Sequence, residues 1–258
     1  PENYLSYEEK YLEHLESLKG SLEIPVIASL NGTTPGGWVN YAQALQEAGA
    51  DALELNVYYI PAAPGEDCCA VEQRYVDVLS AVREKVSIPI TMKLSPQFSS
   101  LVNFALRLEQ AGANGIVLFN RFYQPDIDLE TLEVTPQLEL SSSEESLMRI
   151  RWLAILHGRL KTSMAITGGV HNAQDVLKSL LAGADVTHMC SALLRRGPGH
   201  LAMVLKALIE WMEEREYESV AQLKGSVSQR NATDSAAFLR ANYMSVLDSY
   251  QPPAGVLW

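Results

Sequence analysis

The sequence has few of the features that mark secreted, membrane-spanning or iron–sulfur proteins. Its 258 residues include three cysteines, Cys68, Cys69 and Cys190. An odd number with two adjacent does not suit a disulfide framework, and no cysteine cluster could hold an iron–sulfur centre. No apolar run is long enough to span a bilayer, and no secretory signal is visible at the start. These absences predict a cytoplasmic protein without a membrane partner.

Positive charge is also scarce. The chain has 20 lysines and arginines against 31 aspartates and glutamates, a formal net charge of −11. This balance argues against nucleic acid or an anionic membrane as a general partner, but it leaves room for a local basic pocket that binds a phosphate. Hydrophobic residues make up 47% of the chain, enough for the core of one globular domain over residues 1–258.

Strand-like and helix-like segments alternate along the chain, as they do in parallel βαβ units. Strands are expected at residues 24–30, 52–57, 89–94, 115–119, 164–167 and 186–190. Helices are expected at residues 4–19, 38–48, 71–86, 101–111, 143–157, 173–181 and 201–211. Rough alternation of apolar residues within 122–142 predicts an inserted antiparallel hairpin, and residues 215–258 are expected to form a partly helical tail.

These segments predict an α/β fold of the (β/α)8 TIM-barrel type. Such a barrel has eight strands and often places a phosphate site after the last two. Six strands are visible here, and the last two lead into Gly168–Gly169 and Cys190–Ser191. The visible strands are therefore expected to be the third to the eighth, with the first two lying before Pro1. An open six-stranded sheet is the alternative, but no glycine-rich dinucleotide fingerprint follows its first strand.

Four of the strand ends carry polar side chains, at the side of a β/α barrel where its chemistry lies. Lys93 stands inside the apolar strand ITMKLSP. It is expected to meet an anion or an electron-rich group, because burying it alone would cost a large desolvation free energy. Asn31, Asn56 and Asn120 offer amide donors and acceptors that could read a flavin ring or a pyrimidine, although an asparagine can also simply cap a turn.

The glycine pair Gly168–Gly169 lies at a strand-to-helix turn. Without side chains, the backbone amides of such a turn can approach an anion closely, and the start of the following helix favours negative charge. The alternative is an ordinary strand-to-helix turn, where glycine is common. Cys190 and Ser191 on the neighbouring strand favour the phosphate site.

Eight short stretches share their order along the chain with a known family. They are LNG (30–32), ELN (54–56), MKLSP (92–96), LFN (118–120), residues 140–142, TGGV (167–170), CSALLRRGPG (190–199) and residues 222–225. In this order they resemble the dihydroorotate dehydrogenase family of FMN-containing barrels, over nearly the whole chain. The resemblance implies an FMN-dependent oxidoreductase that oxidises dihydroorotate to orotate in pyrimidine biosynthesis, by hydride transfer to the flavin.

The resemblance also implies roles for individual residues. Lys93 would contact the flavin ring and take part in catalysis, and Asn31 would lie near the flavin. Asn56 and Asn120 would hold the substrate. The residues implied to hold the FMN phosphate through backbone amides are Gly168, Gly169, Cys190 and Ser191.

One position departs from the family pattern. In the family, the asparagine that corresponds to Asn56 is soon followed by a Cys or Ser that acts as general base, whereas Tyr59 stands at that position here. An unperturbed tyrosine pKa of about 10 makes a poor base near neutrality. Cys68 and Cys69, further along the same loop, are alternative bases or simply small residues at a helix start. Cys190 stands where the family often has Gly.

The altered base position leaves three hypotheses open. The chain acts on dihydroorotate, or it is an FMN oxidoreductase for a different unsaturated or pyrimidine-like substrate, or it is a non-catalytic flavin-binding subunit. A small-molecule substrate is the expected partner, and a homodimer is one expected assembly, because dimers are common in the family and among symmetric oligomers. No set of metal ligands is predicted, and the sequence does not specify an electron acceptor.

Overall fold

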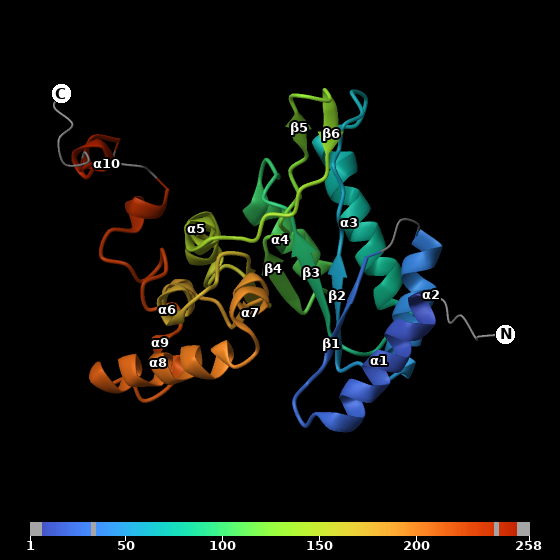
Figure 1. Cartoon of the computed structure of the whole chain (residues 1–258), viewed down its shortest axis with the longest axis horizontal. Helices are drawn as coiled ribbons and strands as arrows, with labels where there is room; N and C mark the ends of the chain where they lie inside the picture. The colour runs from blue at the N-terminus through green and yellow to red at the C-terminus, as the bar shows by residue number, and fades with distance from the viewer. Residues whose placement is uncertain (1–6, 32–34, 240–242, 252–258) are drawn as a thin grey trace.

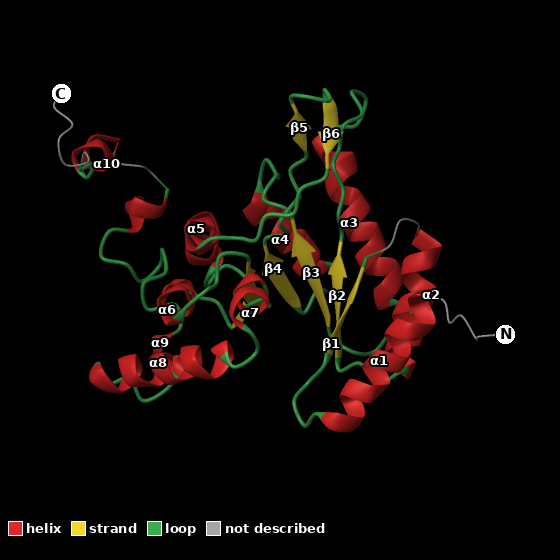
Figure 2. Ribbon diagram, viewed as in Figure 1, coloured by secondary structure: helices red, strands yellow, loops and turns green. Residues whose placement is uncertain are grey.

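The computed structural model describes residues 7–31, 35–239 and 243–251. Six parallel strands form one curled sheet with helices along its outer side (Figure 1, Figure 2). The strands are β1 (Ile27–Leu30), β2 (Ala52–Asn56), β3 (Ile90–Leu94), β4 (Gly115–Leu118), β7 (Ser163–Thr167) and β8 (Val186–His188). They adjoin one another in the order β1-β2-β3-β4-β7-β8. The predicted parallel α/β fold is therefore confirmed.

Helices follow most of the strands and carry the chain back to the start of the next one, as parallel pairing requires. The helices as far as β7 are α1 (Tyr7–Ser21), α2 (Pro35–Glu47), α3 (Cys68–Arg83), α4 (Leu101–Gln110), the 3₁₀ turn η1 (Ser143–Glu145) and α5 (Ser146–Leu156). Those after β7 are α6 (Ala173–Ala182), α7 (Ser191–Arg196), α8 (His200–Glu214), α9 (Val220–Leu223), the 3₁₀ turn η2 (Ser235–Phe238) and α10 (Tyr243–Asp248). Helix α7 was not predicted, and the strand expected at residues 186–190 ends two residues earlier, at His188.

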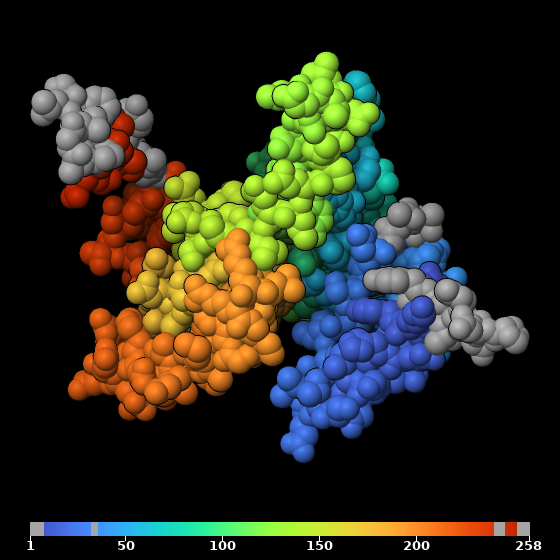
Figure 3. All heavy atoms as spheres, in the orientation of Figure 1, coloured from blue at the N-terminus to red at the C-terminus, as the bar shows by residue number. Residues whose placement is uncertain are grey.

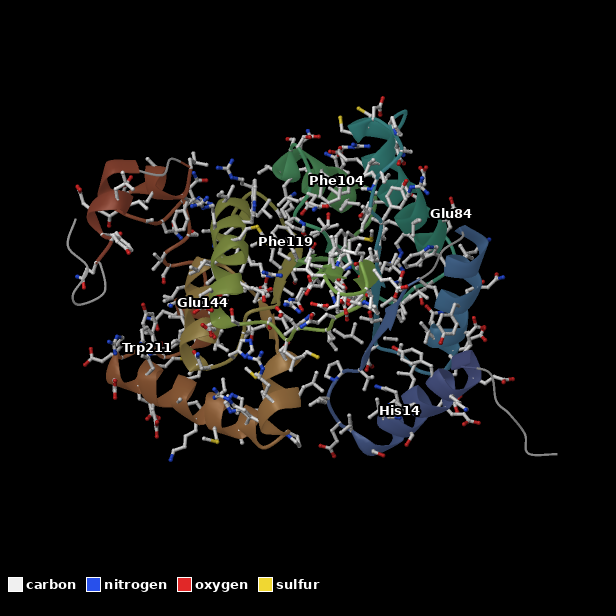
Figure 4. All side chains as sticks on the ribbon, turned by 45° about the horizontal axis from the view of Figure 1, so that its top comes forward. His14, Glu84, Phe104, Phe119, Glu144 and Trp211 are labelled. Carbon is white, nitrogen blue, oxygen red and sulfur yellow. The ribbon has the colours of Figure 1, made fainter. Side chains whose placement is uncertain are left out.

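Helix α4 shows how the sequence builds the core. Leu101, Phe104, Ala105 and Leu108 follow the i, i+3, i+4, i+7 spacing of one helix face, and all four are buried. Strand β4 is buried along its whole length, as expected for a strand inside a parallel sheet. Figure 4 shows Phe104 and Phe119 in the interior, where both side chains are fully buried.

The strand register brings the predicted residues to one edge of the sheet. Asn56 at the end of β2 lies opposite Lys93 on β3, and Thr167 at the end of β7 lies opposite His188 on β8. Asn120 follows β4, and its backbone N–H donates to the carbonyl of Leu94 at 2.6 Å. Because the six strands run in one direction, their carboxyl ends share this edge.

A small antiparallel pair stands beside the same edge. Strands β5 (Asp126–Asp128) and β6 (Glu133–Thr135) pair with Ile127 opposite Val134, inside the segment 122–142. The pair projects at the top of the view, beside the loop that leads into α3 (Figure 1, Figure 3), and the two leucines at its turn, Leu129 and Leu132, are exposed. The hairpin therefore does not belong to the core.

The chain beyond α8 contains α9, η2 and α10, within the segment expected to be a helical tail. Residues 252–258 and Gly32 of the LNG stretch lie outside the described residues. In the described part of the chain, no helix is both long and apolar enough to cross a bilayer. The two barrel strands expected before Pro1 stay a prediction.

Candidate active site

A cavity of about 440 Å³ opens at the carboxyl ends of the strands, and we call it the strand-end cavity. Its volume lies within the range of about 300–1,000 Å³ that is typical of ligand and cofactor pockets. It is lined by eight of the nine site residues named in the sequence analysis, and Tyr59 is not among them. The eight are Asn31, Asn56, Lys93, Asn120, Gly168, Gly169, Cys190 and Ser191.

Lys93 forms a buried ion pair beside the cavity. Its Nζ lies 3.3 Å from Oε1 of Glu54, and Ser29 Oγ donates a hydrogen bond of 2.9 Å to the same oxygen. Glu54 is only 6% exposed, so water screens the attraction less than it would at the surface. The anion that meets Lys93 is thus part of the protein itself.

His188 at the end of β8 extends this cluster. Its Nδ1 lies 3.9 Å from Oε2 of Glu54. Burial is the main cause that lowers the pKa of His188, although the charge of Glu54 opposes the shift. The imidazole is therefore neutral at pH 7, with one nitrogen as donor and the other as acceptor. It lines the strand-end cavity and offers a ligand a neutral polar group.

Asn56 and Asn120 form a pair across the cavity edge. The side-chain amide of Asn120 donates to the side-chain oxygen of Asn56. This bond leaves the amide nitrogen of Asn56 and the amide oxygen of Asn120 for a ligand. One donor beside one acceptor is the complement of a planar cyclic amide.

The turn after β7 depends on its two glycines. Gly168 and Gly169 have φ angles of +85° and +84°, in the region that side-chain-bearing residues seldom adopt. A Cβ on Gly169 would overlap the backbone nitrogen of Ser146 and lie 2.9 Å from its Cα. The turn therefore packs closely against the start of α5 and presents bare backbone to the cavity.

Two serine hydroxyls adjoin this glycine turn. Ser141 Oγ lies 3.0 Å from His171 Nε2 and accepts a hydrogen bond of 3.4 Å from the N–H of Gly169. Ser191 Oγ accepts one of 3.3 Å from the N–H of Ser141. Burial, followed by the charge of Arg195, lowers the pKa of His171, so this ring is neutral at pH 7. Hydroxyls and amides around a bare turn suit an anion such as a phosphate.

Comparison with known proteins places this arrangement in a family. A sequence model described as "Dihydroorotate dehydrogenase" matches residues 2–212. The chain belongs to the dihydroorotate dehydrogenase family. The family assignment made from the eight ordered stretches is thus confirmed.

Curated members of the dihydroorotate dehydrogenase family are about 30% identical to the chain. A "Putative dihydroorotate dehydrogenase A (fumarate)" of Aeropyrum pernix is 30% identical over 78% of this chain and 67% of the relative. The catalytic subunit of "Dihydroorotate dehydrogenase B (NAD(+))" of Methanosarcina mazei is 28% identical over 83% of this chain and 69% of the relative. A "Dihydroorotate dehydrogenase A (fumarate)" of Lactobacillus delbrueckii subsp. bulgaricus is 31% identical over 66% of this chain and 57% of the relative.

Tyr59 stands at the position where the family resemblance places the general base, but its contacts lie elsewhere. Its hydroxyl donates to the carboxylate of Glu66, and the Arg74 guanidinium carbon lies 4.2 Å from its ring centroid. The hydrogen bond to Glu66 is the main cause that raises the pKa of Tyr59, so an even smaller fraction of this phenol is ionised and able to accept a proton near neutrality. These contacts argue against the base role expected for Tyr59, and the neighbouring Tyr58 lines the cavity instead.

Cys68 and Cys69, the alternative bases, also lie away from the cavity. Asp67 caps α3 by accepting a hydrogen bond of 2.8 Å from the N–H of Ala70. The cap places both cysteines in the first helical turn, where both are exposed. Neither lines the strand-end cavity, so the structure favours the simpler interpretation, small residues at a helix start.

Replacing Tyr59 with phenylalanine is expected to change the rate of the oxidoreductase reaction by less than about twofold, because the lost hydroxyl lies outside the cavity. Tyr58→Phe is the matched comparison, since Tyr58 lines the cavity and its hydroxyl accepts a hydrogen bond of 3.2 Å from the N–H of Tyr123. Anaerobic stopped-flow absorbance measures both rates. A fall of about 100-fold or more in Tyr59→Phe would restore Tyr59 as the general base.

Sequence reasoning missed several polar residues of the site. Glu54 in ALELN and His188 in VTHMCS carry the signal that singled out Lys93, a titratable residue inside an apolar strand. The pair Ser141 and His171 left no comparable signal. These two residues are 30 positions apart in sequence, and no local pattern joins them.

Proposed function

We propose that this protein is an FMN-dependent oxidoreductase of the dihydroorotate dehydrogenase type, and that the strand-end cavity binds the flavin. The observation that carries the proposal is the meeting of three elements in one cavity: the glycine turn, Lys93 and the Asn56–Asn120 pair. Membership of the family supports it independently.

The residues present fit FMN. A bare turn with nearby amides and hydroxyls, at Gly168, Gly169 and Ser141, suits the terminal phosphate. Lys93 lines the same cavity with its charge anchored on Glu54. A cavity of about 440 Å³ that is lined by the glycine turn, Lys93 and two asparagines suits a cofactor with a phosphate and a polar ring.

When bound, FMN supplies the hydride acceptor of the reaction. The protein's own groups then have distinct tasks. The positive charge of Lys93 stabilises negative charge that develops in the cavity during the reaction. Asn56 and Asn120 bind the cyclic amide of the substrate and hold it in one orientation, which lowers the entropy cost of the reaction.

A second candidate is an FMN oxidoreductase that acts on a different unsaturated or pyrimidine-like substrate. The described residues that line the cavity include no carboxylate, and the phenol of Tyr58 lies on its wall near the expected base position. A phenol is bulkier than the Cys or Ser of the family pattern, and a phenol in general holds its proton more tightly than a thiol does. This change favours a substrate of different shape or one that needs a different proton acceptor.

The test is to add dihydroorotate, without oxygen, to the FMN-loaded full-length protein and to follow the flavin absorbance. Bleaching is expected if dihydroorotate is the substrate. A protein that binds FMN and stays yellow supports the second candidate, whereas a protein that binds no FMN contradicts both. The reduced protein is then mixed with fumarate or with NAD⁺ to find which oxidant restores the colour. These two are chosen because the name of one relative gives fumarate and the name of another gives NAD(+).

A further inference from the structure

Arg149 on α5 is a buried cation that the proposed chemistry does not use. Arg149 is only 4% exposed. Its Nε donates to the carbonyl of Thr167 at 2.5 Å, and its Nη1 donates to the carbonyl of Glu145 at 2.5 Å. A Cβ on Gly168 would lie 2.8 Å from Nη2. The guanidinium thus lies directly against the glycine turn, on the side of α5.

The charge of Arg149 is not neutralised by a carboxylate of its own. Within the described part of the chain, its hydrogen bonds go to backbone carbonyls. The carboxylate of Glu145 acts on it from a distance, but that carboxylate is paired with Arg121 at 3.0 Å. Two guanidinium groups, those of Arg149 and Arg121, therefore share one carboxylate beside the glycine turn.

Other positive charges lie near the same turn, together with the carboxylate of Asp175, whose Oδ2 accepts a hydrogen bond of 2.9 Å from the N–H of His171. Arg195 and Arg196 both act on His171, two positions after Gly169. Arg195 Nη2 also donates to the carbonyl of Leu140 at 2.9 Å, next to the serine beside the turn. This gathering of arginines contrasts with the net charge of −11 of the whole chain. Burying a guanidinium without a carboxylate of its own costs desolvation free energy, unless another anion compensates the charge.

We propose that Arg149 is a positioning residue that selects a phosphate monoester at the Gly168–Gly169 turn. The proposal rests on the proposed FMN site and adds the residue that distinguishes FMN from riboflavin. Arg149 acts in two ways. Its bond to the Thr167 carbonyl holds the backbone that leads into the turn, and its charge, one residue layer behind the turn, stabilises the phosphate on the cavity side.

The experiment compares the affinities of FMN and riboflavin for the full-length protein and three variants, by quenching of flavin fluorescence. Arg149→Met removes the charge and keeps most of the length of the side chain. It is expected to weaken the binding of FMN about tenfold or more and the binding of riboflavin by less than about threefold. Arg149→Lys keeps a positive charge and is expected to recover most of the preference for FMN over riboflavin. Arg151→Met is the matched control, because Arg151 is exposed on the same helix.

The ratio of the two affinities separates an effect of charge from an effect of folding, since a fraction of unfolded protein lowers the apparent affinity for both flavins alike. An equal loss of affinity for FMN and for riboflavin in Arg149→Met, or no loss of affinity for either, would overturn the proposal. A second readout uses inorganic phosphate alone and does not depend on flavin. Phosphate is expected to raise the melting temperature of the wild type and of Arg151→Met, but not of Arg149→Met.

These two readouts also distinguish the proposal from the proposed function. A wild type that is stabilised by phosphate through Arg149 but binds no flavin would contradict the FMN proposal and support the role of Arg149. A wild type that binds FMN and riboflavin equally, with no response to phosphate, would support a flavin site and overturn the role of Arg149.

Discussion

Replacing Lys93 with methionine is expected to slow flavin reduction by about 100- to 1,000-fold, the loss typical of removing one electrostatic group from a reaction site. Lys93 lines the strand-end cavity and is held by Glu54 at 3.3 Å, so its charge is oriented before the substrate binds. Anaerobic stopped-flow absorbance with a substrate that bleaches the flavin gives the rate. Lys178→Met, which removes an exposed lysine on α6, is expected to leave the rate unchanged.

Stability has to be separated from catalysis in the Lys93 variant. Without Lys93, the 6%-exposed Glu54 loses its lysine partner and keeps the hydroxyl of Ser29, and breaking a buried ion pair costs up to about 3–5 kcal/mol. The double variant Glu54→Gln with Lys93→Met removes both charges and is expected to regain most of the stability but none of the rate. A double variant that reduces flavin at the wild-type rate would show that Lys93 acts only through the fold.

Replacing Gly169 with alanine is expected to lower the free energy of unfolding by about 2–5 kcal/mol, the sum of backbone strain and overpacking. Its φ of +84° disfavours any side chain, and the new Cβ would overlap the backbone of Ser146, which cannot move without shifting α5. Gly197→Ala is the matched control. Gly197 has φ and ψ angles of +79° and 168°, but a Cβ there would meet no atom within 4 Å, so only backbone strain of about 1–3 kcal/mol is expected.

Urea unfolding followed by circular dichroism measures both glycine variants. The same samples report FMN affinity, which is expected to fall in Gly169→Ala because the turn can no longer hold its backbone in place. Equal destabilisation of the two variants would mean that the close packing of Gly169 on Ser146 is not what the turn requires.

Much of the fold was predictable because its signals are local. The spacing of Leu101, Phe104, Ala105 and Leu108 is read within three turns of one helix. Polar residues at strand ends are likewise visible in short stretches, and parallel strands necessarily carry those ends to one edge. The fold accordingly brings eight of the nine predicted site residues to the wall of the strand-end cavity, and their roles toward FMN and substrate stay predictions.

The partners of those residues were not predictable in the same way. Lys93 was expected to meet an anion, but the pairing with Glu54 follows from the register of β2 against β3, between residues 39 positions apart. The adjacent Tyr58 and Tyr59 were also indistinguishable by pattern. Only the contact with Glu66 shows that the second of them leaves the cavity.

The sequence by itself determined the alternation of strands and helices, the acidic net charge and the residues at the strand ends, because hydrophobic periodicity and composition act along the chain. The tertiary structure alone decided which of two arginines on α5, Arg149 or Arg151, is buried. It did so because Arg149 packs on a glycine turn 19 residues away. Burial of a charge depends on what the folded chain places around it, and no local pattern carries that information.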